Sequence, residues 1–392
     1  MVPSAITNII KAGIGMMNKF WRKTMLVRRG RRVLLYFESS TMTEHFADFV
    51  SLFSDDNRLK YFVCYNKKNF KNEEEFKRIC REKMNLTSFI SSEFAFLRPW
   101  DLVVSADLYL PRGINSSDCR TLFINHGTHI ISYNGGNDAY TYSDRAYAAN
   151  MSPLFSIMFE PNKRIAEYVT ANIPGLSKAV KYVGHKNADS LLSLAKNKKM
   201  YRERLNVKDG EKLVMMIGSW NRYSLFHALG KELLAQAKGL MSKGYKFILT
   251  IHPIEYNRYR PDIEPLGKVI ESARSEGFIV RSPSDDWMPY MIASDIVICD
   301  YSSLHESAIL LNKKIIFSDF PDTICWKHSI ARQIKPLLPR LKNATELEKA
   351  LSEVENLNIS ETVYAYSKEL YSGPGEYKNR CRGLVYDLLS LG

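Results

Sequence analysis

Polar residues that could do acid-base or phosphate chemistry stand directly behind several short apolar runs of this sequence, where strands would end. The residues in this position are His126, Ser219, His252 and Ser302. Ligands in open parallel sheets bind beyond the carboxyl ends of the strands, so a doubly wound topology would gather these side chains toward one cleft. Their convergence is a stronger indication of a site than any one of them alone.

The two histidines suit different steps of a transfer reaction. A histidine titrates near neutral pH, so His126 could accept the proton of an attacking hydroxyl, and Gly127 beside it would let a substrate approach the backbone. A protonated His252, which Pro253 follows, could offset charge on a leaving phosphate. The alternatives are structural: a histidine hydrogen-bonded at a strand end, or a His-Pro turn that ends a strand.

The segment from Ser294 to Phe317 is predicted to form a complete βαβ unit. The apolar, β-branched run 296–299 suits a strand covered on both faces, and residues 304–311 are apolar with good helix formers. Polar residues at 312–314 end the helix before the next strand, at 315–317. The rest of the chain can be organised around this unit.

Two serines of this unit fall at the predicted N-terminus of its helix. Free backbone N–H groups and the positive end of the helix dipole make such a position suitable for a phosphate. The alternative is plain capping, because Ser303 and Glu306 have the spacing of a capping box, and such boxes serve ordinary helices more often than ligands. Ser302 would then be left for a ligand.

Apolar runs alternate with helical stretches in two successive series, which predicts two doubly wound α/β domains. The predicted strands are 33–37, 61–65, 102–104, 122–124, 154–159 and 180–183, then 214–217, 247–251, 278–280, 296–299 and 315–317; the main helices are 73–83, 189–206, 226–243 and 376–391. The polar stretch 131–150 is expected to be a loop. Two Rossmann-like domains facing a central cleft make the GT-B architecture.

The expected boundaries follow from this reading. Residues 1–32 would be a membrane-surface segment, 33–186 an N-terminal acceptor-side domain, 187–371 a C-terminal nucleotide-donor domain, and 372–392 a helix packing back across the domains. A chain of 392 residues exceeds what one hydrophobic core usually serves, which agrees with two domains.

Composition excludes several function classes. Six scattered cysteines form neither a CxxC pair nor a His-Cys cluster, so no metal site and no disulfide framework is expected, and a reducing cytoplasm fits best. Neither a dinucleotide-binding glycine motif nor a P-loop is present, which disfavours oxidoreductases and NTPases. No apolar run reaches the length of a membrane span.

The N-terminus is predicted to form a basic amphipathic helix. Its apolar residues at helical spacing are Ile6, Ile9, Ile10, Ile14, Met17 and Trp21. The first 32 residues hold eight Lys or Arg and no acid, out of a net charge of +13. This pattern is typical of a helix on an anionic membrane surface. The alternatives are a helix docked on its own domain and, least favoured, a nucleic-acid arm, since no nucleic-acid module appears.

Four segments, in order, resemble the CDP-glycerol glycerophosphotransferase family, which includes teichoic acid primases and polymerases. They are HGT at 126–128, VGHKNAD at 183–189, IHP at 251–253, and ASDIVICDYSSLHESAILLNKKIIF at 293–317, with Asp286 and Met291 before it. The set spans about half of the chain. Each motif alone is weak, whereas the ordered set is fairly specific.

The resemblance implies a GT-B transferase that moves glycerol phosphate, or a related polyol phosphate, from a CDP donor to a hydroxyl of a lipid-linked or capsule-like glycan and releases CMP. It implies that His126 is the catalytic base and that His252 lies by the donor's pyrophosphate. The residues expected to bind the donor, from the motifs and the strand ends, are Gly127, Ser219, Arg222, Asp300, Ser302, Ser303 and Glu306.

The same reading implies a cytoplasmic protein, peripheral on the inner face of the cell membrane, with no metal or cofactor beyond its donor. Its expected partners are the nucleotide-activated donor, the glycan acceptor and an anionic membrane surface. Binding to nucleic acid is not expected. Its length resembles primase-type members more than long-chain polymerases.

The sequence departs from the family's pattern at three places. His129–Ile131 stand where proline and lysine are common, and Lys186–Asn187 replace a Pro-Arg pair. Ser307 occupies the place of an expected acid, with Glu306 one position earlier. If Glu306 binds the ribose hydroxyls, the helix must present it with a different rotation.

Two other functions fit the same fold. One is a GT-B glycosyltransferase that uses a sugar nucleotide for cell-surface polysaccharide synthesis. The other is a scaffold without activity, which the persistence of both histidines and the serine pair disfavours. The transferases differ in their product, a nucleoside monophosphate or a nucleoside diphosphate.

Overall fold

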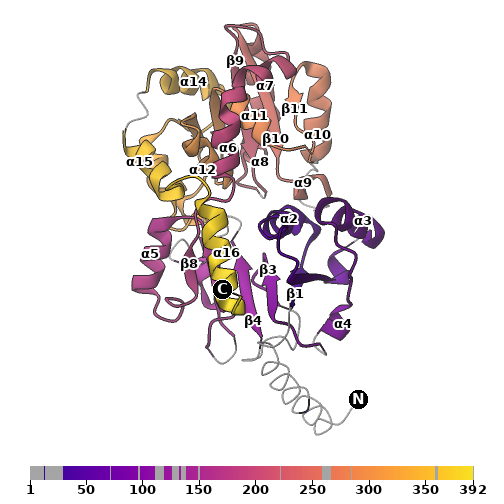
Figure 1. The fold of residues 1–392 in the computed structure, drawn as a ribbon. Helices are drawn as coiled ribbons and strands as arrows, with labels where there is room; N and C mark the ends of the chain where they lie inside the picture. The colour runs from indigo at the N-terminus through magenta and orange to yellow at the C-terminus, as the bar shows by residue number, and fades with distance from the viewer. Residues whose placement is uncertain are drawn as a thin grey trace. The chain divides into compact units, whose positions relative to one another are not determined.

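The computed structural model describes residue 13 and residues 30–70, 72–95, 98–110, 119–125, 132–133, 138–148, 151–220, 222–257, 266–283, 285–357 and 361–391. The chain divides into two compact units. Unit 1 comprises Met1–His126, Thr141–Val183 and Gly375–Gly392, and unit 2 comprises Gly127–Tyr140 and Gly184–Pro374. Each unit is an α/β layer structure (Figure 1).

Unit 1 is built on a six-stranded parallel sheet in the order β2-β1-β3-β4-β7-β8. Its strands are β1 Arg31–Phe37, β2 Leu59–Tyr65, β3 Leu102–Ser105, β4 Arg120–Ile124, β7 Ile157–Glu160 and β8 Val180–Tyr182. The chain first moves outward from β1 to β2 and then returns to the other side of β1. The order therefore reverses between β1 and β3.

Unit 2 repeats this plan with the parallel order β11-β10-β9-β12-β13-β14. Its strands are β9 Lys212–Gly218, β10 Tyr245–Ile251, β11 Ile279–Val280, β12 Ile296–Cys299, β13 Lys314–Ser318 and β14 Arg340–Leu341. The order reverses between β9 and β12, which is the position where open α/β sheets bind ligands.

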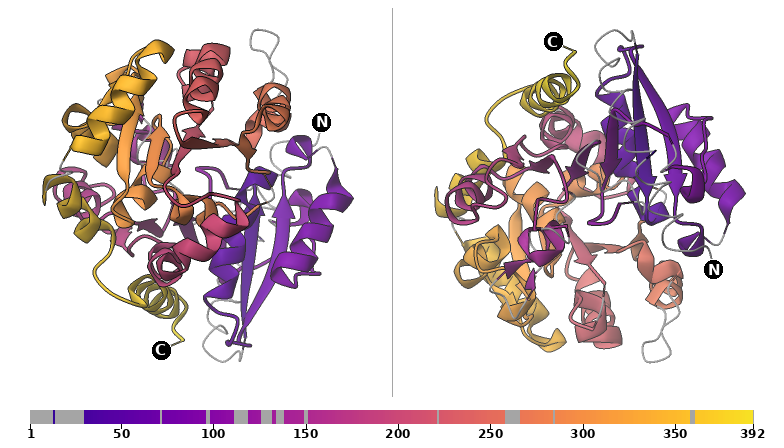
Figure 2. Two further views of the ribbon diagram at one scale, coloured as in Figure 1. Left: turned by 90° about the horizontal axis from the view of Figure 1, so that it is seen from above. Right: turned by 90° about the horizontal axis from the view of Figure 1, so that it is seen from below.

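The strands of unit 2 are largely apolar because helices cover both faces of the sheet (Figure 2). Leu213, Met215 and Ile217 pack into one core cluster, while Val214 and Met216 pack into the other. Helices within residues 188–204, 288–293, 304–310, 330–334 and 361–370 contribute to the first cluster, and helices within 225–241, 266–272 and 347–356 to the second. This alternation is the period of two expected of a strand buried on both sides.

The described helices of unit 1 are α2 Thr43–Ser51, α3 Glu73–Met84, α4 Ser92–Ala95, α5 Lys163–Asn172 and α16 Glu376–Leu389. Those of unit 2 are α6 Ala188–Leu194, α7 Lys198–Arg204, α8 Leu225–Met241, α9 Ile254–Asn257, α10 Leu266–Ser272, α11 Met288–Ala293, α12 Leu304–Leu310, α13 Ile330–Ile334, α14 Leu347–Asn356 and α15 Glu361–Leu370. None of the helices in the described ranges is long and apolar enough to cross a bilayer.

Helix α16, at the end of the chain, belongs to the core of unit 1. Cys381, Val385 and Leu389 are fully buried against the face of the sheet that α2 and α3 also cover. Burying a side chain the size of Val385 or Leu389 contributes about 1.5 to 3 kcal/mol. Packing therefore holds the C-terminal helix to strands that lie at the other end of the sequence.

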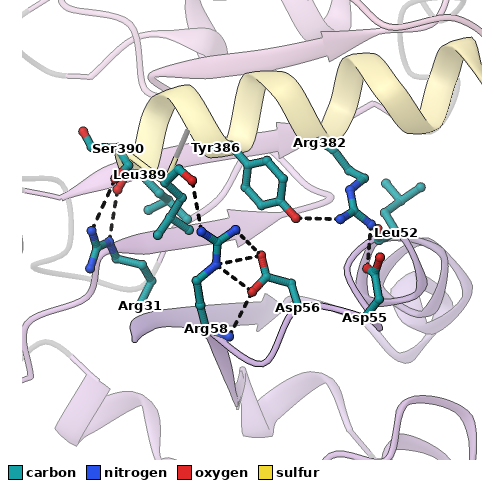
Figure 3. Close-up of polar contacts among 10 residues, drawn as sticks. Arg31, Leu52, Asp55, Asp56, Arg58, Arg382, Tyr386, Leu389 and Ser390 are labelled. Atoms are coloured by element: carbon teal, nitrogen blue, oxygen red, sulfur yellow. Dashed lines mark hydrogen bonds and ion pairs between the residues drawn. The ribbon is translucent and has the colours of Figure 1, made fainter. Parts of the chain in front are cut away.

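Arginines fix the C-terminal end of α16 (Figure 3). The Nε of Arg31 donates to the carbonyl of Leu389 at 3.0 Å, and Nη1 of Arg58 donates to the carbonyl of Leu391 at 3.0 Å. Arg382 on the helix donates to Asp55 at 2.6 Å. Cations at a helix C-terminus satisfy its last carbonyls and oppose the negative end of its dipole. Since Arg31 begins β1 and Arg58 precedes β2, these contacts close the amino edge of the sheet.

The predicted α/β order of the two halves is confirmed, but β14, the sixth strand of unit 2, was not predicted, and there are three further local differences. The predicted helix 189–206 is two helices, α6 and α7, separated by a 3-10 turn at Ala195–Asn197. Lys198, directly after the turn, forms an ion pair with Asp295 at 2.6 Å. The predicted loop contains a short hairpin, β5 Ser132–Tyr133 with β6 Asp138–Ala139.

The third difference is a strand boundary. β7 starts at Ile157, later than the predicted 154, because Pro153 and Leu154 pair with Tyr147 and Ala146 instead. The predicted amphipathic helix of residues 1–32 falls outside the described residues, apart from residue 13 and positions 30–32.

Candidate active site

The carboxyl edge of the unit 2 sheet is organised around Asp300, which directly follows β12. Its side chain is fully buried. Oδ2 accepts hydrogen bonds from the backbone N–H groups of Ser219 and Leu225, both at 2.8 Å, and Oδ1 accepts one from the N–H of Ser302 at 2.9 Å. Burial raises the pKa of Asp300 to about 6, although these bonds favour the ionised form.

The loop between β9 and α8 supplies two of the expected donor-binding residues. Ser219 begins this loop and is buried, with its backbone N–H bound to Asp300. Arg222 is exposed, and its Nη2 donates to the hydroxyl of Tyr223 at 2.7 Å while its guanidinium lies 4.7 Å from the centre of that ring. Arg222 is thus a cation at this edge of the sheet, as its place after β9 predicts.

His252 stands at the end of β10, the neighbouring strand. Its N–H donates to the carbonyl of Gly218 at 2.9 Å, which continues the pairing of β10 with β9. Its Nδ1 accepts a hydrogen bond from the N–H of Ile254 at 3.2 Å. In the neutral ring the proton therefore sits on Nε2, and the imidazole is a hydrogen-bond donor there.

The serine pair departs from the capping box suggested by its spacing. Ser303 is the N-cap of α12 but has helical dihedral angles, φ −59° and ψ −15°, and its side chain makes no capping hydrogen bond. The hydroxyl oxygen of Ser302 instead accepts a hydrogen bond from the N–H of Leu304 at 3.4 Å. Glu306 is 2% exposed, on a short helix whose residues from 305 to 310 are all buried.

The corresponding edge of unit 1 holds a buried polar cluster that the sequence did not single out. Glu160, the last residue of β7, accepts hydrogen bonds from Nδ2 of Asn125 at 3.1 Å and from the hydroxyl of Tyr142. It also accepts one from the N–H of Asn162 at 2.8 Å. Asn125 ends β4 and immediately precedes the predicted base, His126. His126 and Gly127 themselves lie outside the described residues.

The structure therefore brings five of the predicted positions to one edge of one sheet. These are Ser219, Arg222, His252, Asp300 and Ser302, with Ser303 and Glu306 on the adjoining turn and helix. Glu160 could have been found from sequence by the same rule that found Asp300, because an acid ends an otherwise apolar strand in both cases. Tyr142 carried no such signal, since it comes from the predicted loop.

Comparison with known families agrees with the motifs. The family model described as CDP-Glycerol:Poly(glycerophosphate) glycerophosphotransferase matches residues 22–323. The chain belongs to this family. It is accordingly a transferase, and the resemblance predicted from its four motifs is confirmed. Among curated proteins, none matches the chain.

Solved structures resemble the whole chain at low sequence identity. A variant of the wall teichoic acid polymerase TagF soaked with CDPG matches with a TM-score of 0.62 and 14% identity, over 98% of each chain. MnaA of S. aureus with UDP gives 0.59 and 13%, over 92% of this chain and 98% of that one. The UDP-GlcNAc 2-epimerase of Neisseria meningitidis gives 0.54 and 15%, over 92% and 100%. These similarities establish a two-domain GT-B-like fold.

Proposed function

We propose that this family member transfers glycerol phosphate, or a related polyol phosphate, from a CDP-activated donor to a hydroxyl of a lipid-linked or teichoic-acid-like glycan. The acceptor oxygen attacks the β-phosphorus, the bond from that phosphorus to the bridging oxygen breaks, and CMP leaves. The protein's contribution is to position the two substrates and to offset phosphate charge.

The observation that supports this proposal is the gathering of Ser219, His252 and Ser302 at the strand-order reversal of unit 2, in a chain that belongs to this family. In the proposal unit 2 binds the donor. Nε2 of His252 donates to the pyrophosphate, and a cation at Arg222 lies within the same set of loops. Gly127, Ser303 and Glu306 complete the proposed donor-binding set.

The proposed base is His126, on the acceptor side, in unit 1. The buried cluster of Asn125, Glu160 and Tyr142 fixes the end of β4 from which His126 follows. A base placed there takes the proton of the acceptor hydroxyl as the new oxygen–phosphorus bond forms.

The donor class can be tested by ligand stabilisation. CDP-glycerol, CDP-ribitol and common UDP sugars are compared for the shift in melting temperature of the purified chain. A ligand present at 100 times its Kd adds about 2.7 kcal/mol to the free energy of unfolding. We expect a CDP-polyol to give the largest shift. Stabilisation by a UDP sugar and not by either CDP-polyol would favour a sugar-nucleotide glycosyltransferase instead.

We also propose that residues 1–32 hold the enzyme on the cytoplasmic face of the membrane. Deletion of residues 1–27 should abolish binding to vesicles that contain anionic lipid, because an apolar face and several cations are removed together. The deletion should leave the melting temperature unchanged. Equal vesicle binding by the full-length and shortened chains would contradict this assignment.

A further inference from the structure

One buried carboxylate joins two loops that the proposed donor site needs. Asp300 accepts backbone hydrogen bonds from Ser219 and Leu225, the two ends of the loop between β9 and α8. It also accepts one from Ser302, in its own turn between β12 and α12. All three bonds are 2.8 to 2.9 Å long, and the side chain is 0% exposed. The carboxylate is thus occupied by backbone groups.

A second contact holds the same loop near its start, at the residue after Ser219. The hydroxyl of Tyr301 donates to the carbonyl of Trp220 at 2.5 Å. Tyr301 is 5% exposed, and its ring packs edge-on against Phe320 with 5.6 Å between the ring centres. Residues 300 and 301 together therefore hold the first two residues of the β9–α8 loop and the residue that follows its end.

Joining two strands through a fully buried carboxylate costs free energy. An ionised carboxylate without water is disfavoured unless a cation or several hydrogen bonds compensate it. At the other end of the same strand, Asp295 also binds a backbone N–H of the β9 segment, that of Leu213 at 3.0 Å. Asp295, however, is partly exposed and paired with two cations. Simple cohesion of the sheet does not require the burial seen at Asp300.

We propose that Asp300 is a positioning residue of the donor site: it holds the β9–α8 loop against the β12–α12 turn, so that the groups of both loops form one binding surface. The inference rests on the function proposed above, because Ser219, Arg222 and Ser302 are taken to face the donor. Asp300 itself does not touch the donor, since its oxygens are bound to backbone N–H groups.

Two conservative substitutions remove the two contacts separately. In Asp300→Asn the side chain keeps one acceptor oxygen for three N–H groups, so at least one bond is lost. Tyr301→Phe removes only the hydroxyl that binds Trp220. Each lost bond to a charged or buried partner corresponds to roughly tenfold in the population of the positioned loop. We expect each variant to raise the KM for CDP-glycerol about tenfold and to change kcat by less than about threefold.

The double variant tests whether both contacts act on one loop. If they do, Asp300→Asn and Tyr301→Phe together should raise KM by less than the product of the two single effects. The matched control is Asp295→Asn, at the opposite end of β12, which should leave KM unchanged even if it lowers the melting temperature. Should Asp300→Asn fail to fold, Tyr301→Phe alone still decides the KM question.

A measurement without substrate separates this inference from the proposed function. Amide hydrogen exchange resolved to Ser219 and Leu225 should accelerate in Asp300→Asn and remain at the wild-type rate in Asp295→Asn. Unchanged exchange in Asp300→Asn, or an equal rise of KM in Asp295→Asn, would overturn the positioning role. Faster exchange in Asp300→Asn, together with no turnover of CDP-glycerol by the wild-type protein, would overturn the proposed donor and keep the loop contact.

Discussion

Two aspartates flank β12 of unit 2, and their environments are opposite. Asp295 precedes β12 with its side chain 31% exposed, and it pairs with Lys198 at 2.6 Å and Arg202 at 2.7 Å. Asp300 follows β12 with no exposed surface, and its oxygens accept hydrogen bonds from the backbone N–H groups of Ser219, Leu225 and Ser302. Burial raises the pKa of Asp300. At Asp295 burial acts in the same direction, but the hydrogen bonds from Lys198, Leu213 and Arg202 outweigh it, so the pKa is lowered.

The difference shows how the two edges of the sheet are used. At the amino edge, cations neutralise the carboxylate and also bind helix carbonyls, as Lys313 does with Ile292 at 2.8 Å. At that edge the carboxylate of Asp295 has two cationic partners, whereas Lys313 is bound to carbonyls and burial lowers its pKa to about 7. At the carboxyl edge a desolvated carboxylate holds loops in place at a cost to stability, which is how functional sites often differ from their scaffold. We therefore expect substitutions at the carboxyl edges to affect catalysis and those at the amino edge to affect stability alone.

The largest effect is expected at His126, after β4 in unit 1. His126→Ala should lower kcat by about 10²- to 10⁴-fold, the usual contribution of a general base, and leave donor affinity unchanged. Turnover with saturating CDP-glycerol and a melting curve on the same sample check this. Activity near that of the wild type, or a collapsed melting temperature, would show that the histidine is structural.

A smaller effect is expected for the donor-binding groups of unit 2. His252→Gln and Ser302→Ala should weaken CDP-glycerol binding by about 1.5 to 3 kcal/mol, the range for a hydrogen bond to a charged group. The matched control is Ser294→Ala at the amino edge, where the hydroxyl donates to the carbonyl of Met291 at 2.8 Å. Calorimetric titration should separate the variants. The edge comparison would fail if Ser294→Ala lost as much affinity as Ser302→Ala.

The smallest effect is the pH dependence of stability at the two ends of β12. The pKa of Asp300 is about 6 in the folded chain, above the unfolded value near 3.9. Its contribution to the free energy of unfolding is therefore fully present below about pH 4 and is lost as pH rises through 6. The stability deficit of Asp300→Asn should therefore shrink by on the order of 1 to 2 kcal/mol between pH 4.5 and 7.

The pKa of Asp295 is shifted in the opposite direction. Its pKa is lowered, so its contribution is present above the unfolded value and is lost only as pH falls through the folded one. The deficit of Asp295→Asn should be constant over the same interval of pH. Urea denaturation of both variants and the wild type measures the two trends, and parallel trends would remove the electrostatic contrast between the edges.

The sequence predicted the edge of unit 2 well because strand ends are local features. An apolar run that stops at Asp300 or at His252 can be read without knowing the fold. The partners of Asp300 could not be predicted, since Ser219 and Leu225 are distant in sequence and the bonds come from backbone groups. Periodicity carries no information on such contacts.

The capping box shows the converse error. The spacing of Ser303 and Glu306 matches a box, but a side-chain cap requires extended backbone at the cap residue, and Ser303 is helical. Ser302, one position earlier, is held by Asp300 and its hydroxyl receives the N–H of Leu304. A contact between residues two apart in the chain thus accompanies the use of Ser302, and not Ser303, at the start of the helix.

The most direct test of the account is the product formed from CDP-glycerol. The purified chain is incubated with CDP-glycerol and a membrane-derived glycan acceptor, and nucleotides are separated by chromatography. We predict release of one CMP for each glycerol phosphate transferred, and a release about 10²- to 10⁴-fold slower in the His126→Ala variant. Formation of a nucleoside diphosphate from a sugar nucleotide, with CDP-glycerol left intact, would contradict the account.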